Sequence, residues 1–305
     1  MSLYVERTAG LAQLQDGGRF GVRHLGVTQG GALDSVAQRW ANGLLGNPPD
    51  AAVVEIPLGA LVLRCEADTT LALCGADLAA TLDGVPLPVW ASFRVRAGQR
   101  LAFGAPRRGV RGYLAAPGGF QAPRPLGACA TVFREGLGGL HGDGRPLAAG
   151  DRLPFVPAQP APRAVPAAQR PALDGPFELE VVLGAQVGGF AGASLFAAFN
   201  AEWRLDARSD RMGARLRGPV LRYDGPALVS EGIPLGAIQV PPDGQPIVLL
   251  NDRQTIGGYP RLGALTPLAV AQLAQVPAGA PLRLRPVSVE AARRRWLAHE
   301  AQWRG

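Results

Sequence analysis

Polar side chains surround two apolar runs between residues 230 and 260. Their types could bind a small polar ligand and catalyse a reaction on it. Gln239 interrupts the first run, and Asn251-Asp252-Arg253-Gln254-Thr255 follows the second. Gln239 and Gln254 are predicted to donate amide hydrogens to a polarised carbonyl oxygen. Asp252 is the best candidate for a general base or for positioning a water molecule. The structural alternatives are amides that fix turns and a solvated strand exit.

A second polar segment precedes this one, with the sequence Ser209-Asp210-Arg211-Met212-Gly213. Arg211 offers a planar guanidinium that suits a carboxylate or a phosphate. We therefore predict that Ser209, Asp210 and Arg211 bind an acidic substrate. Tyr259, in the Gly257-Gly258-Tyr259-Pro260 bend, is a further candidate that would donate a hydrogen bond. An ion pair that anchors the loop, and packing of the tyrosine in the corner, are the alternatives.

A β-hairpin is predicted to position the first polar set. Strands are expected over Gly236–Val240 and Pro246–Leu250, and Pro241-Pro242-Asp243-Gly244 joins them. Proline presets φ in such a turn, Asp can bond its own backbone, and Gly accepts a positive φ. The 41 Gly and 28 Pro of the chain favour many turns and short strands throughout.

The chain is predicted to contain two β-rich parts. Residues 1–156 hold short apolar or alternating runs and one helix over Ser35–Leu45, capped by Asp34. Residues 157–176 are rich in Pro and Ala and are expected to form an extended, semi-rigid linker. Residues 177–305 are again β-rich, and three helices are expected there: Ser194–Asn200, a short one started by Thr266-Pro267, and Val289–Trp303 capped by Ser288.

Composition excludes several classes of chemistry. All 31 basic residues are arginine, so a Schiff base, a biotinyl lysine and a Walker-type lysine are impossible on this chain. The arginines are dispersed, without a nucleic-acid-binding signature. Cys65, Cys74 and Cys129 are expected to be reduced thiols, and three scattered histidines predict no zinc site. We expect no metal, no nucleic acid and no membrane partner, and a cytoplasmic location.

The motifs resemble a known family. The SDRMG block, GAIQVPPDGQPIVLLNDRQTIGGYP, Gln15-Asp16-Gly17-Gly18-Arg19 and Gly30-Gly31-Ala32-Leu33-Asp34 together resemble the carboxyltransferase family, long labelled allophanate hydrolase subunit 2. That family includes the C subunit of bacterial 5-oxoprolinase, part of the urea carboxylase carboxyltransferase domain, and an antagonist of a sporulation-kinase inhibitor. The resemblance covers about Gln15 to about Ala291. It implies a mainly β fold with a few helices, in two β-barrel-like, cyclophilin-like subdomains.

The resemblance leaves three functions open. The first is the C subunit of an ATP-dependent 5-oxoprolinase, a lactam hydrolase active in a hetero-oligomer with its companion A and B subunits and forming L-glutamate. The second is a carboxyltransferase of the urea carboxylase type, with biotin carried by another chain. The third is a non-catalytic antagonist of a kinase inhibitor. One departure from the family is Ala185-Gln186-Val187-Gly188-Gly189-Phe190, which lacks the usual acidic pair.

Overall fold

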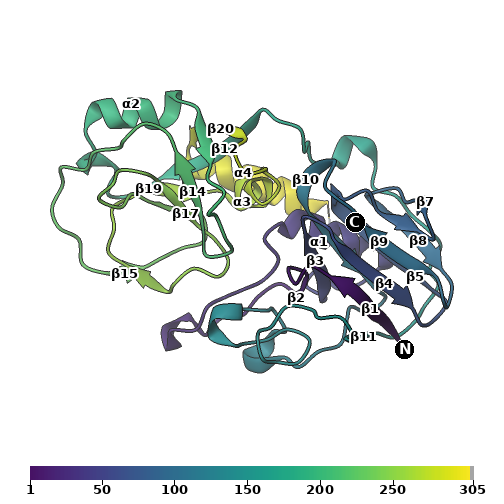
Figure 1. Cartoon of the computed structure of the whole chain (residues 1–305). Coiled ribbons are helices and arrows are strands. Elements are labelled where there is room, and N and C mark those ends of the chain that lie inside the picture. Colours follow the sequence, from purple (N-terminus) through teal and green to yellow (C-terminus); the bar gives the residue numbers. More distant parts are fainter. Residues whose placement is uncertain (303–305) are drawn as a thin grey trace. The chain divides into compact units, whose positions relative to one another are not determined.

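The computed structural model describes residues 1–302, and the chain divides into two compact units (Figure 1). The first unit comprises Met1–Val22 and Gln29–Leu173. The second comprises Arg23–Thr28 and the described residues from Asp174 onward. The short segment Arg23–Thr28 therefore belongs to the second unit although it lies within the N-terminal part of the sequence. Nothing in the residue pattern indicated this assignment.

Two antiparallel sheets build the first unit, and residues from both contribute to one hydrophobic cluster. Leu3 and Leu63 represent one sheet in this cluster, and Val54 and Leu71 the other; all four are fully buried. The six-stranded sheet has the order β11 (Arg152–Pro154), β1 (Ser2–Thr8), β4 (Leu61–Cys65), β9 (Arg100–Phe103), β6 (Thr81–Leu82), β7 (Val85–Pro86). The five-stranded sheet has the order β2 (Gln13–Gln15), β3 (Val53–Pro57), β10 (Arg108–Ala115), β5 (Thr69–Asp77), β8 (Ala91–Val95).

Helix α1 (Ser35–Leu45) packs on β5 and β10 of the five-stranded sheet. Its bounds and its cap confirm the sequence prediction. The Asp34 carboxylate accepts a hydrogen bond from the Ala37 N–H at 2.9 Å, which satisfies one of the free donors at the helix start. Gly46 ends the helix in the left-handed region, with φ of 73°.

The Pro- and Ala-rich segment is extended and bonded to the first unit over much of its length. The Thr70 N–H donates to the Ala158 carbonyl at 2.9 Å, and the Ser92 N–H donates to the Arg163 carbonyl at 2.8 Å. Val165 is buried in the cluster that also holds α1. Compact packing of the first unit thus continues to Leu173, whereas the sequence predicted its end at residue 156.

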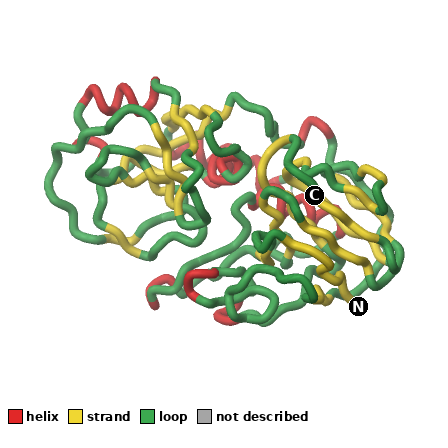
Figure 2. The backbone as a smooth tube through the Cα atoms, in the orientation of Figure 1, coloured by secondary structure: helices red, strands yellow, loops and turns green. Residues whose placement is uncertain are grey.

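A closed seven-stranded barrel forms the frame of the second unit (Figures 1 and 2). Neighbouring strands are antiparallel except β12 and β20, which run parallel. The order around the barrel is β12 (Phe177–Leu183), β19 (Arg261–Leu265), β16 (Ala237–Gln239), β17 (Ile247–Leu249), β14 (Gly213–Arg217), β13 (Trp203–Leu205), β20 (Pro281–Val287). The mainly β architecture with few helices is confirmed.

The predicted hairpin is present as β16 and β17, with Ile238 opposite Val248. Its turn closes through the Gly244 N–H, which donates to the Pro241 carbonyl at 2.9 Å. A short two-stranded ribbon, β15 (Glu231–Gly232) and β18 (Ile256–Gly257), lies outside the barrel sheet.

Helices α2 (Gly192–Asn200), α3 (Pro267–Leu273) and α4 (Val289–Ala301) complete the second unit. Thr266 and Ser288 cap the last two as predicted. The predicted end at Trp303 lies outside the described residues. Short 3-10 helices cover Arg23–Leu25, Pro125–Gly127, Phe133–Glu135, Ala167–Gln169 and Val187–Gly189.

Candidate functional site

The predicted residues Arg211 and Asp252 form a bidentate ion pair. Arg211 Nε donates to Asp252 Oδ2 at 2.9 Å, and Nη2 donates to Oδ1 at 3.0 Å. The Asp252 N–H also donates to the Arg211 carbonyl at 2.9 Å. Both side chains are largely buried, with 14% and 10% of their areas exposed. This is the anchoring geometry that was the alternative for Arg211; substrate binding by Arg211 and general-base work by Asp252 stay predictions.

Asp210 and Ser209 bond to the backbone at the start of β14. Asp210 Oδ1 accepts from the Met212 and Gly213 N–H groups at 2.8 and 3.0 Å. Ser209 Oγ accepts from the Arg215 N–H at 3.0 Å. These bonds shape the turn that presents Arg211 to Asp252. Tyr259 lies in the predicted bend with about half of its surface (49%) exposed.

Gln239 and Gln254, called the amide pair below, come together around Gly257. A Cβ atom added to Gly257 would lie 2.9 Å from Gln239 Nε2 and 3.6 Å from Gln254 Nε2. It would also lie 2.6 Å from Ile233 Cδ1, so only glycine fits there without a shift of its neighbours. Gln239 is 3% exposed, and its buried Nε2 has no hydrogen-bond partner within residues 1–302. The sequence therefore identified two side chains that the fold does bring together.

Two arginines that the sequence did not single out lie beside the same ribbon, and they are called the arginine pair below. Arg253 is 2% exposed; its Nε and Nη1 donate to the Ile233 and Leu250 carbonyls, both at 3.1 Å. Arg23 Nη2 donates to the Ile233 carbonyl at 2.7 Å and to the Thr255 carbonyl at 3.1 Å. Two guanidinium groups thus share one carbonyl oxygen, that of Ile233.

The arginine pair has an unfavourable electrostatic setting. Burial, together with the positive charge of Arg23, lowers the pKa of Arg253 to about 9. Burial also lowers the pKa of Arg23. A bound anion would reverse both effects, because opposite charge favours the charged form of a guanidinium. Arg253 could have been noticed from its place in the polar run after β17; no local signal marks Arg23, which is more than 200 residues away in sequence.

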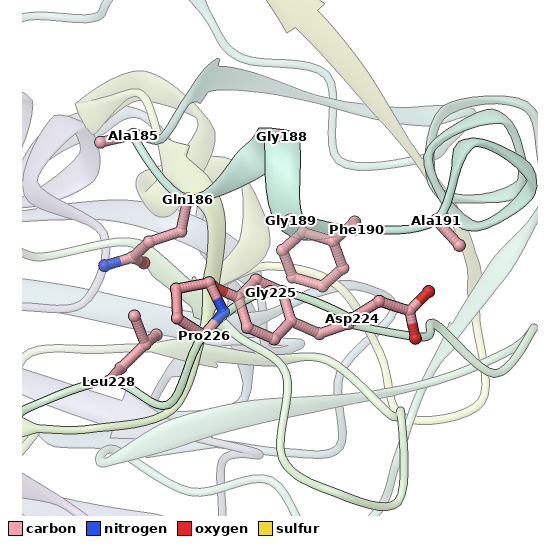
Figure 3. A pocket seen from close by; sticks show the side chains of 11 residues that line it. Ala185, Gln186, Gly188, Gly189, Phe190, Ala191, Asp224, Gly225, Pro226 and Leu228 are labelled. Carbon is pink, nitrogen blue, oxygen red and sulfur yellow. The ribbon is translucent and has the colours of Figure 1, made fainter.

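A groove of about 560 Å³ is lined by Gln186, Phe190 and Tyr223, among other residues (Figure 3). Phe190 and Tyr223 meet there edge to face, with ring centroids 5.1 Å apart. In Figure 3 the Phe190 ring points toward the loop that carries Gly225 and Pro226. Gln186 stands where the family's acidic pair was expected, and its Oε1 accepts from the Arg261 N–H at 2.9 Å. Its amide also donates to Glu231, which forms an ion pair with Arg261.

The charged residues of the Gln15–Arg19 motif have structural partners in the first unit. Asp16 is fully buried and accepts from the Gly18 and Cys129 N–H groups at 2.8 and 2.7 Å. Arg19 donates to the Pro125 and Ala128 carbonyls. Burial, together with the negative charge of Asp83, raises the pKa of the Cys65 thiol to about 12, as suits a small buried hydrophobe. All three cysteines are free and buried.

Within residues 1–302, no group of three or more His, Cys, Asp or Glu side chains is placed to hold a metal ion. In the same part of the chain, no helix has both the length and the apolar character needed to cross a membrane.

Comparison of the chain with known protein families identifies its family. The chain belongs to the family described as carboxyltransferase domain, subdomain A and B, whose model matches residues 25–286. This confirms the resemblance found from the motifs.

Relatives in this family carry different names. The chain is 40% identical to an Escherichia coli protein named as the C subunit of 5-oxoprolinase, over 95% of this chain and 93% of that protein. It is 36% identical to the protein of the same name from Haemophilus influenzae, over 92% of this chain and 90% of that one. The crystal structure of the Kluyveromyces lactis urea amidolyase matches 99% of this chain, with a TM-score of 0.91 and 26% identity. The chain spans only 20% of that much longer protein.

Proposed function

We propose that this chain is the C subunit of an ATP-dependent 5-oxoprolinase complex, which opens the lactam ring of 5-oxoproline to give L-glutamate. The observation that carries the proposal is the amide pair at Gly257, where the buried Gln239 Nε2 has no protein partner within residues 1–302. The similarity to two proteins that bear this name, over nearly their whole length, supports it.

The chemistry of lactam opening explains why such a pair is useful. Attack on the ring carbonyl places negative charge on its oxygen, and donors already aimed at that oxygen stabilise the charge without reorganising. The missing side chain at Gly257 lets the ribbon backbone pack directly against the two Nε2 atoms. A single donor of this kind contributes about a hundredfold to a thousandfold in rate in other enzymes.

Asp252 would position or deprotonate the attacking water, with Arg211 holding its carboxylate in place. Asp252→Asn keeps the shape of the side chain and removes its charge. The proposed role predicts a loss of turnover of about a hundredfold or more, from the usual size of general-base catalysis. A purely anchoring role predicts that turnover falls only with the folded fraction of the protein.

ATP is assigned no step on this chain. The sequence has no lysine, so it lacks the lysine of a Walker-type phosphate site, and we place the handling of ATP on the companion A and B subunits. Biotin cannot be attached here for the same reason.

Carboxyl transfer from biotin is the second candidate, and one observation favours it. The urea amidolyase of Kluyveromyces lactis matches 99% of this chain at a TM-score of 0.91. In that reaction the amide pair would bind the ureido or carboxyl oxygen of a carboxylated biotin carried by another chain. The non-catalytic antagonist is the third alternative; it would use the same fold without turnover.

The deciding experiment measures ADP release that depends on 5-oxoproline, with this chain reconstituted with its companion subunits. We expect turnover that avidin does not inhibit and that disappears when this chain is left out. Avidin-sensitive ATP use with urea instead would establish the carboxyltransferase. A tight complex without turnover on either substrate would overturn both catalytic proposals in favour of the antagonist.

A further inference from the structure

Several arginines of the second unit form ion pairs with carboxylates. Arg208 and Arg217 both bond to Asp206. Arg211 is bidentate to Asp252, and Arg285 and Arg295 bond to Glu180. Arg23 differs, because both of its hydrogen bonds go to backbone carbonyls.

Arg23 has more hydrogen-bond donors than the described part of the protein satisfies. Its Nη2 has two carbonyl partners, whereas its buried Nη1 has no hydrogen-bond partner in the part of the chain that the structure describes. No carboxylate in that part of the chain forms an ion pair with it. A buried N–H without a partner costs free energy, and a charged one costs more than a neutral one. A position of this kind is therefore one where an acceptor from outside the chain would bind.

Gln239 provides a second, independent observation at the same ribbon. The residue is only 3% exposed, and its buried Nε2 has no hydrogen-bond partner within residues 1–302. The Gly257 position that faces this atom lies two residues after Thr255, whose carbonyl orients Arg23. Ile233 connects the two: its carbonyl accepts from both arginines, and its Cδ1 lies against Gly257. Two unsatisfied buried donors thus flank one short ribbon.

We propose that the arginine pair is an anion subsite that binds the carboxylate group of a small ligand, with Arg23 Nη1 as the donor left available for it. The carbonyls of Ile233 and Thr255 aim the Arg23 guanidinium, and the buried Arg253 supplies the second positive charge. The anion offsets the repulsion between two guanidinium groups that share a carbonyl. Segment Arg23–Thr28 then has a reason to leave the N-terminal part of the chain and join the second unit.

Two small anions offer the charged pair of oxygen atoms that this subsite would bind: the α-carboxylate of 5-oxoproline, and bicarbonate. Only the choice of 5-oxoproline rests on the proposed function; the anion subsite itself does not. The test is calorimetric titration of the full-length chain with L-5-oxoproline, with 2-pyrrolidinone, which is the same lactam without the carboxylate, and with bicarbonate.

We expect 5-oxoproline to bind at least about tenfold more tightly than 2-pyrrolidinone, the usual size of one charged hydrogen bond. Arg23→Gln should abolish this difference, whereas the matched control Arg283→Gln, on the exposed side of β20, should keep it. Arg23→Lys should restore it in part, because it keeps the charge and loses the planar fork.

The outcomes of this titration distinguish the anion subsite from the proposed 5-oxoprolinase function. Binding of bicarbonate but not of 5-oxoproline, lost in Arg23→Gln, would keep the subsite and overturn the oxoprolinase substrate. Equal binding of 5-oxoproline and 2-pyrrolidinone without bicarbonate binding would overturn the subsite and leave the proposed function standing. A folded Arg23→Gln protein that binds every anion as the natural chain does, or a natural chain that binds none, would also overturn the subsite.

Discussion

Two buried glutamines, one in each unit, show how differently this protein treats its interior polar groups. Gln15 in the first unit is fully buried; its Nε2 donates to the Thr131 carbonyl at 3.0 Å and its Oε1 accepts from the Gly31 N–H at 3.1 Å. Gln239 in the second unit is almost as buried, yet its Nε2 has no partner within residues 1–302. The amide of Gln15 thus has hydrogen-bond partners for both its nitrogen and its oxygen, whereas the amide nitrogen of Gln239 has none in the described residues.

The surroundings of the two glutamines follow the same division. In the first unit, Glu55 is buried and accepts from the Leu33 N–H and the Tyr113 hydroxyl, both at 2.9 Å. In the second unit, the arginine pair crowds onto one carbonyl. Matched polar groups specify and stabilise a fold, whereas surplus buried donors cost stability and are retained where a ligand uses them. The contrast between these two places supports the proposal that the ribbon of the second unit binds a ligand.

The largest effect on stability is expected at the matched ion pair. Arg211→Ala leaves the Asp252 carboxylate, only 10% exposed, without its bidentate partner. Breaking such a pair from one side costs about 3–5 kcal/mol of the free energy of unfolding. Urea denaturation measures this loss. Arg222→Ala is the control, because its pair with Asp224 is exposed and is worth less than about 1 kcal/mol. Equal losses in both variants would contradict the burial argument.

A smaller loss is expected at the matched glutamine. Gln15→Leu leaves the Thr131 carbonyl and the Gly31 N–H without this partner in a buried site. Each unsatisfied group costs roughly 1–3 kcal/mol, so thermal unfolding should shift down by several degrees. An unchanged melting temperature would mean that water satisfies these groups. It would contradict the claim that the hydrogen bonds of Gln15 stabilise the first unit.

Gly257→Ala tests the space at the ribbon. The added methyl would lie 2.6 Å from Ile233 Cδ1 and 2.9 Å from Gln239 Nε2, so one of them must move. Overpacking of this size costs about 1–2 kcal/mol. We expect turnover per folded molecule to fall as well, because the methyl pushes Gln239 Nε2 away from the position that the proposal requires. Turnover that follows the folded fraction alone would remove Gly257 from the site.

The smallest effect is expected for the contribution of Asp206 to folding stability at low pH. Hydrogen bonds from Arg208, and then from Arg217, hold the pKa of Asp206 well below its usual range. Because the folded pKa is the lower one, the stability it contributes is present above the unfolded pKa and is lost as pH falls toward the folded one. Between about pH 5 and about pH 2, the natural chain should therefore lose more stability than Asp206→Asn. If stability falls equally with pH in the two proteins, Arg208 and Arg217 do not hold the Asp206 carboxylate in solution.

Local patterns predicted the local parts of this structure. The cap and bounds of α1, the hairpin of β16 and β17, and the nearness of Gln239 and Gln254 each depend on residues close in sequence, where turn chemistry and capping decide the outcome. Arg211 and Asp252 were both singled out, but as separate functional groups; their ion pair spans 41 positions and is set by the pairing of β14 with β17.

Arg23 could not have been predicted from the sequence. Its partners lie 210 and 232 positions away, at Ile233 and Thr255, and the segment that carries it crosses from one unit to the other. The same long-range packing decides that residues 157–173 belong to the first unit. Hydrophobic periodicity and turn residues report on neighbours along the chain, and they carry no information on such contacts.

The central claim is that Gln239 is kept for a ligand and not for the fold. Its most direct test measures both the free energy of unfolding and the 5-oxoproline-dependent turnover of Gln239→Leu in the reconstituted complex. Leucine has a similar volume and no donor, so stability should stay within about 0.5 kcal/mol or rise, since an unpaired buried donor is removed. Turnover should fall by about a hundredfold or more. A marked loss of stability with turnover per folded molecule unchanged would contradict the account.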